Sequence, residues 1–153
     1  MLHEFLTANK AELVQRCRDK VIRRSPTRHQ TSGIAPFLDQ LIRTLVMEQG
    51  ADPMQSRRVS GPDGGHSAPS EMGGTATERG RELLSHGYSV DEVVHDYGDL
   101  CQAITDLAYE RKEAIEADEF RTVNRCLDNA IATAVVEFTS QRDCQAADRN
   151  TQD

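Results

Sequence analysis

Two long segments in the second half of the chain place apolar residues three and four positions apart, which is the spacing of an amphipathic helix. The first is expected from Ser89 to about Arg111, and its stripe holds Val90, Val93, Val94, Tyr97, Leu100, Cys101, Ile104, Leu107 and Ala108. The second is expected from about Glu116 to Gln141, and its stripe holds Phe120, Val123, Leu127, Ala130, Ile131, Ala134 and Phe138. No segment shows the alternation typical of strands, so we predict an all-α fold.

Local start and stop signals divide the chain into five or six helices. Three capping boxes are each expected to begin a helix: Asn9 with Glu12, Thr75 with Glu78, and Ser89 with Glu92. The last is reinforced by Tyr88 and Val93, which are placed as a hydrophobic staple, so it is the best-defined boundary. Helix ends are predicted before Pro26, at Gly50 and at Gly87.

The chain is expected to form one globin-like or bundle-like domain over residues 1–142. Residues 50–74 hold six of the ten glycines and three of the five prolines, which predicts a long flexible loop. After this loop, Ala76 and Gly80 lie one turn apart, and their small size would let another helix approach closely. Residues 143–153 lack large apolar side chains, so we expect a disordered tail there.

Charge is distributed unevenly along the 153 residues. The formal net charge of -7 argues against a nucleic-acid-binding protein. Residues 1–35 carry seven Lys or Arg and three Asp or Glu, whereas residues 89–119 carry two and ten, an asymmetry that favours helix pairing or a protein partner. No apolar run approaches the roughly 18 residues of a membrane span. The N-terminus also lacks the pattern of a signal peptide, so we expect a cytoplasmic protein that does not insert into a membrane.

The cysteines and histidines do not match a metal or redox motif. The cysteines are far apart and are expected to be reduced thiols: Cys17, Cys101, Cys126 and Cys144. The five histidines include no HxxxH pair, and the chain has no GxSxG nucleophile motif. The sequence therefore predicts no metal, no cofactor and no catalytic residues.

His95 lies on the expected polar face of the helix that begins at Ser89. Asp91 and Asp99 precede and follow it by one turn, and Gln102 lies one turn further along. Carboxylates at this spacing favour the imidazolium form, so His95 could act as a proton switch. A histidine followed directly by an acidic residue on an exposed helix is also the arrangement of phosphoryl-accepting histidines. The sequence thus indicates a candidate signalling or interface face formed by these four residues.

Tyr97 and Asn124 are polar residues on the first apolar stripe and at the edge of the second. Since buried polar groups need hydrogen-bond partners, we expect them to bond to each other or to the backbone. Alternatively, together with the near-core Cys101, they line a small-molecule pocket between the two helices. Asn129 is expected to lie outside the core.

The two helical segments resemble a known family. Residues 88–108 and 119–135 are similar to the N-terminal sensory domain of bacterial sensor histidine kinases, which is related to the RsbRD-type N-terminal domain of stressosome co-antagonist proteins. The likeness covers most of residues 2–142 and is more specific in the second half. It implies an all-helical regulatory domain without haem or catalytic activity, usually dimeric, that passes a signal to a C-terminal output module.

We therefore expect a sensory or regulatory domain that forms a homodimer. Its partner would be a kinase or other output module, or a separate signalling protein. One alternative is a histidine phosphotransfer protein that uses His95, for which phosphoryl label on that residue would be the evidence. Another is a globin-like sensor of haem or a small ligand, for which a Soret band or a co-purified ligand would be the evidence.

Overall fold

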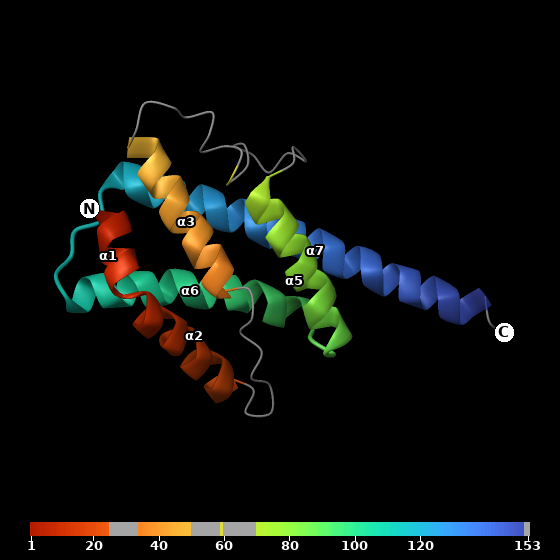
Figure 1. Ribbon diagram of the computed structural model, residues 1–153. Coiled ribbons are helices and arrows are strands. Elements are labelled where there is room, and N and C mark those ends of the chain that lie inside the picture. Colours follow the sequence, from red (N-terminus) through yellow and green to blue (C-terminus); the bar gives the residue numbers. More distant parts are fainter. Residues whose placement is uncertain (25–33, 50–58, 60–69, 152–153) are drawn as a thin grey trace.

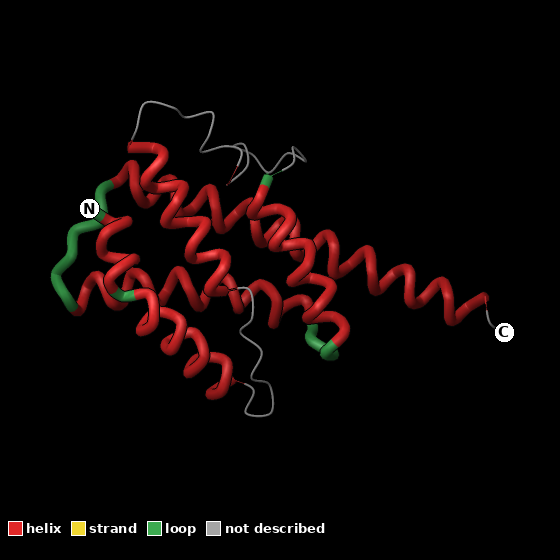
Figure 2. The backbone as a smooth tube through the Cα atoms, viewed as in Figure 1, coloured by secondary structure: helices red, strands yellow, loops and turns green. Residues whose placement is uncertain are grey.

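Residues 1–24, 34–49, 59 and 70–151 are described by the computed structural model of the chain. These residues form six α-helices and contain no strand, which confirms the predicted all-α fold (Figures 1 and 2). The helices are α1 (Leu2–Ala8), α2 (Lys10–Arg24), α3 (Ile34–Gln49), α5 (Glu71–Ser85), α6 (Val90–Glu110) and α7 (Ala117–Thr151). None of these helices is long and apolar enough to cross a membrane.

The helices α6 and α7 run side by side in opposite directions and form the frame of a bundle-like single domain (Figure 1). Helix α2 packs along α6, and α5 packs along α7 through the most extensive helix–helix contact in the described part of the chain. Helix α3 contacts α1, α5 and α7. The first and second halves of the sequence therefore share one core.

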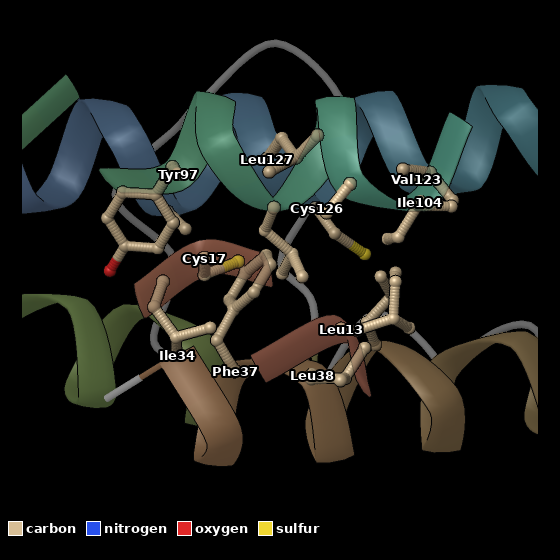
Figure 3. Packing of buried hydrophobic residues seen from close by; sticks show 14 of the residues in the cluster. Leu13, Cys17, Ile34, Phe37, Leu38, Tyr97, Ile104, Val123, Cys126 and Leu127 are labelled. Carbon is tan, nitrogen blue, oxygen red and sulfur yellow. The ribbon is translucent and has the colours of Figure 1, made fainter. Parts of the chain in front are cut away.

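The core is formed by apolar side chains from every described helix. Figure 3 shows Phe37 and Leu38 from α3 packed beneath Cys17 and Leu13 from α2, with α6 and α7 above them. The rings of Phe37 and Tyr97 make an edge-to-face contact with centroids 5.3 Å apart. Each large apolar side chain contributes about 1.5–3 kcal/mol on burial, so this shared core is the main source of stability.

The predicted boundary at Ser89 is confirmed. Its capping box with Glu92 is present, and the staple residues Tyr88 and Val93 are both buried. Gly87 ends the preceding helix with a φ of 79°, a left-handed conformation that favours glycine. The local pattern of caps was therefore a sound guide to where α5 ends and α6 begins.

The predicted start of α5 at Thr75 is wrong. The helix begins at Glu71, because the side chain of Ser70 accepts a hydrogen bond of 3.0 Å from the backbone of Gly73. Thr75 instead accepts from the Gln40 side chain on α3, at 2.9 Å. The last four residues of the predicted 50–74 loop are thus helical, Val59 is buried, and residues 50–58 and 60–69 lie outside the described residues.

The predicted capping box at Asn9 is also not formed. The Asn9 side chain donates to the carbonyl oxygen of Phe5 at 2.8 Å and so closes α1, although α2 does begin at the predicted place, directly after Asn9. Its side-chain oxygen accepts from Arg111, and Glu12 accepts from Arg111 as well. Both predicted capping side chains therefore bind the far end of α6.

Helix α7 extends well beyond its predicted end near Gln141. It continues to Thr151, so the expectation of a disordered tail over residues 143–153 is wrong for the part that is described. Propagation of an existing helix adds one hydrogen bond for each residue fixed, and the polar residues of this segment include good helix formers. Apolar contacts are therefore not needed for the helix to continue.

Some side chains depart from the predicted faces. Phe120 and Val94, expected in the apolar stripes, are 40% and 37% exposed, whereas Asn129, expected outside, is buried. Val94 lies at the edge of its stripe, Phe120 lies in the first turn of α7, and Asn129 faces away from the apolar stripe of α7. Contacts with neighbouring helices decide exposure at these positions, and helical periodicity alone does not reveal those contacts.

Candidate functional site

Helices α2 and α6 are joined by a row of polar and charged contacts. Arg16 on α2 pairs with Glu110 on α6 at 2.6 Å, and Lys20 donates to Gln102 at 3.4 Å. Arg24 forms a bidentate ion pair with Asp99: Nη1 donates to Oδ1 at 3.0 Å and Nη2 donates to Oδ2 at 2.7 Å. The basic N-terminal segment and the acidic segment after residue 89 therefore pair as adjacent helices.

This row ends in a group of charges that reaches from the surface into the interior, which we call the charge cluster: Arg24, Arg79, Asp96 and Asp99. Arg79 reaches in from α5 and donates from Nη2 to Asp96 at 2.6 Å, with both side chains at most 2% exposed. The Arg24 guanidinium lies 3.9 Å from Asp96 and closer to Asp99. The cluster thus joins α2, α5 and α6 at one point.

The geometry of α6 explains why the two carboxylates meet. Asp96 and Asp99 are three residues apart, so they lie on one face of the helix. Asp96 also lies beside the buried positions Val93 and Tyr97, and this turn of the helix therefore faces inward rather than toward solvent. The charges stay buried because each carboxylate has an arginine partner.

Burial changes the acidity of the groups around the cluster. It raises the pKa of Asp96, and the opposing attraction of Arg79 offsets only part of that effect. It raises the pKa of the Cys17 thiol to about 12, with further contributions from Asp99 and Asp96. The pKa of Tyr97 also rises to about 12, again mainly through burial. Cys17 and Tyr97 therefore keep their protons at neutral pH, which makes the thiol a poor nucleophile.

The predicted signalling face is only partly on the surface. His95, Asp91 and Gln102 are exposed, as expected, and the hydroxyl of Ser89 lowers the pKa of Asp91. Asp99 is 4% exposed and bound by Arg24, so its placement on this face is wrong. The rotation of α6 turns Asp99 toward α2, a partner that the local sequence pattern does not reveal.

The predicted set of Tyr97, Cys101 and Asn124 does not come together as expected. Tyr97 is fully buried, Cys101 is half-buried and Asn124 is exposed on α7. The Tyr97 hydroxyl has no hydrogen-bond partner among the described residues, so the predicted bond to Asn124 is absent. Burial raises the pKa of the Cys101 thiol, which is consistent with its near-core position.

Another polar arrangement lies outside the cluster. Near the start of α7, a pocket of about 100 Å³ is lined by Leu45, Glu48, Asp118, Glu119, Arg121 and Thr122. Glu48 accepts hydrogen bonds from Thr122 and Arg125, while Glu119 accepts from the backbone of Leu2 at 2.8 Å. These carboxylates tie the ends of α1, α3 and α7 together. No group of three or more histidine, cysteine or acidic residues in the described part of the chain is arranged to hold a metal ion.

Arg79 was not among the predicted site residues, although its position in the sequence carries a signal. Arg79 lies three residues after Ala76 and four before Leu83, both of which are buried, so it occupies a position on the inner face of α5. A charged residue at such a position needs a buried partner of opposite sign.

None of the protein families, curated proteins and solved structures with which the chain was compared matches the chain.

Proposed function

We propose that this chain is a non-catalytic regulatory domain of bacterial signal transduction, acting in the cytoplasm as a homodimer. In this role it relays a signal through α7 to a histidine kinase or a similar output module. The observation that carries the proposal is the form of α7: one half is packed in the domain, and the other half extends away from it (Figure 1).

The two halves of α7 differ in their surroundings. Buried residues recur along its first part: Val123, Cys126, Leu127, Ala130, Ala134 and Phe138. Residues 142–148 are exposed, and this segment has no large apolar side chain on any face. A helix that is polar all round is typical of connections that cross solvent between domains. Such a helix would carry a displacement of its packed half to whatever it joins.

The packed half of α7 is held at close range by α5. A β-carbon at Gly80 would lie 2.7 Å from the carbonyl oxygen of Ala134, closer than side chains normally approach. This confirms the prediction that the small residue at position 80 lets another helix approach closely. Arg81 adds an ion pair to Glu137 at 2.6 Å. A small change in the position of α5 would therefore move α7, because the interface has no room to absorb it.

The test of this relay is a chimera in which α7 leads, in continuous helical phase, into the dimerisation and catalytic core of a histidine kinase. Gly80→Ala should change autophosphorylation at least several-fold, since the added methyl group pushes α7 from α5. Gly74→Ala is the matched control, because a β-carbon there meets no atom within 4 Å. Equal kinase activity in the two variants would contradict the relay. The dimer is tested separately, by sedimentation of the chain without the kinase core, and a monomer there would contradict it.

One observation favours phosphotransfer as a second candidate function. His95 is exposed on α6, directly before the buried Asp96. Incubation with a phosphorylated response regulator or acetyl phosphate should then label the wild-type chain but not His95→Gln. A chain that remains unlabelled under both conditions would exclude this function while leaving the regulatory proposal intact.

A further inference from the structure

Part of the Arg79 guanidinium in the charge cluster has no hydrogen-bond acceptor among the described residues. A guanidinium has five N–H groups, and the Arg79 side chain donates to Asp96 through Nη2. Its Nε and Nη1 atoms are buried and have no acceptor among the described residues. Buried donors in proteins are nearly always paired, so this part of the molecule is suited to an additional acceptor.

Tyr97 adds another donor in the same neighbourhood. Its hydroxyl is buried without a partner among the described residues, and Tyr97 directly follows Asp96, the carboxylate that binds Arg79. In Figure 3 the hydroxyl points away from Leu127 and Cys126. The edge-to-face contact with Phe37 holds the ring, so packing fixes the direction of this donor.

The charges of the cluster limit what kind of acceptor fits. Two arginines face two aspartates, so the cluster is already balanced. A bound anion would add an uncompensated negative charge beside Asp96 and Asp99, which is costly in a buried position. A cation would meet unpaired donors rather than acceptors. An uncharged oxygen atom satisfies both the donors and the charge balance.

We propose that Arg79 and Tyr97 form a binding site for a small uncharged ligand that presents a carbonyl or amide oxygen. The oxygen accepts hydrogen bonds from the Arg79 guanidinium and the Tyr97 hydroxyl. Arg24, whose side chain is 32% exposed, lies on the solvent side of the cluster. Because it names the class of signal that is sensed, this inference rests on the proposed regulatory function, although binding itself can be measured on the chain alone.

The test uses acetamide as the probe and follows backbone amide signals of the wild-type chain by NMR. We expect saturable shifts around residues 79 and 97, with a Kd below about 10 mM. Tyr97→Phe removes one hydroxyl and keeps the ring, and it should weaken binding at least tenfold. Tyr109→Phe, on the same helix but with an exposed side chain, is the control and should bind as the wild type does.

Several results would overturn the site. These are shifts that do not saturate, binding unchanged by Tyr97→Phe, acetate bound as tightly as acetamide, or a crystal grown with acetamide in which only water contacts Arg79. Should Tyr97→Phe not fold, contacts between the acetamide methyl group and the Tyr97 ring in nuclear Overhauser spectra of the wild type decide the matter. If acetamide binds but leaves the activity of the kinase chimera unchanged, the site stands but is not where the signal enters, and the relay is still judged by Gly80→Ala.

Discussion

Arg79 and Asp96 show how one pair of residues can determine the arrangement of two helices, α5 and α6. Burying two charges is costly, and their attraction repays that cost only while both are present. The pair therefore contributes little net stability compared with apolar residues, but it penalises any packing in which the two side chains separate. At this scale, the cluster specifies how α5 approaches α6.

Asp96→Asn removes one charge and leaves the Arg79 guanidinium buried without an ionic partner on α6. The free energy of unfolding should fall by about 1–3 kcal/mol, measured by urea denaturation, because a charge-assisted hydrogen bond is lost while the burial cost of the Asp96 charge is removed as well. Asp106→Asn, at an exposed position of the same helix, should change it by less than about 0.5 kcal/mol. A loss below about 1 kcal/mol for Asp96→Asn would show that water reaches the pair in solution.

Cys17 and Tyr97 make the fold sensitive to alkali. The Cys17 thiol ionises near 9.0 in the unfolded chain, and burial raises its pKa to about 12 in the folded one. Between these values the folded state binds more protons, so the free energy of unfolding falls as pH rises, by about 1.4 kcal/mol per pH unit. This stability is fully present below pH 9.0 and is lost as pH rises toward about 12. Burial of Tyr97 adds to the loss above 10.0.

Urea denaturation at several pH values between 8 and 11 checks this dependence. Cys17→Ala should flatten the decline, even if its stability is lower throughout. Cys144→Ala, which alters an exposed thiol, should leave the slope as it is. The same slope in all three chains would mean that the Cys17 thiol ionises as easily in the folded state as in the unfolded one.

At the scale of helices, the approach of α5 to α7 depends on the missing side chain at position 80. Alanine is a better helix former than glycine by about 1 kcal/mol, so both Gly74→Ala and Gly80→Ala favour the isolated helix. At Gly80 the added methyl group would meet the Ala134 carbonyl oxygen, so the alanine substitution there destabilises the fold instead of stabilising it. We expect Gly80→Ala to lower the free energy of unfolding by about 1–3 kcal/mol in thermal or urea unfolding. Gly74→Ala should leave the free energy of unfolding unchanged or raise it.

A gain in stability for Gly80→Ala would contradict the close packing of α5 on α7. It would mean that the helices are separated enough in solution to accept a methyl group. Retention of helical content in both variants, followed by circular dichroism, separates this effect from simple unfolding of α5.

For the whole molecule, the sequence allowed some features to be predicted and left others hidden. The boundary at Ser89 was predictable because a capping box and a staple involve residues only a few positions apart. The charge asymmetry favoured pairing of the basic and acidic segments, but it did not identify the side chains that contact one another. Arg79 and Asp96 come from different helices, and their contact follows from how those helices pack.

The same reasoning explains the errors in the candidate site. Asp99 was placed on the surface with His95 because the pattern around it is polar, yet α2 covers that side of α6 with Arg24. The extension of α7 was missed since its last residues lack an apolar stripe, and a helix that is already formed does not need one to continue. Local signals therefore located most helix ends, and long-range contacts decided the site.

The central claim is that the position of α7 depends on how α5 packs against it. Pulsed electron paramagnetic resonance measures this directly, with spin labels at Tyr109→Cys and Val136→Cys, two highly exposed positions, in a chain whose Cys101 and Cys144 are replaced. We predict that the distribution of distances between α6 and α7 shifts or broadens in Gly80→Ala and stays the same in Gly74→Ala. Superimposable distributions in both variants and the parent chain would contradict the account.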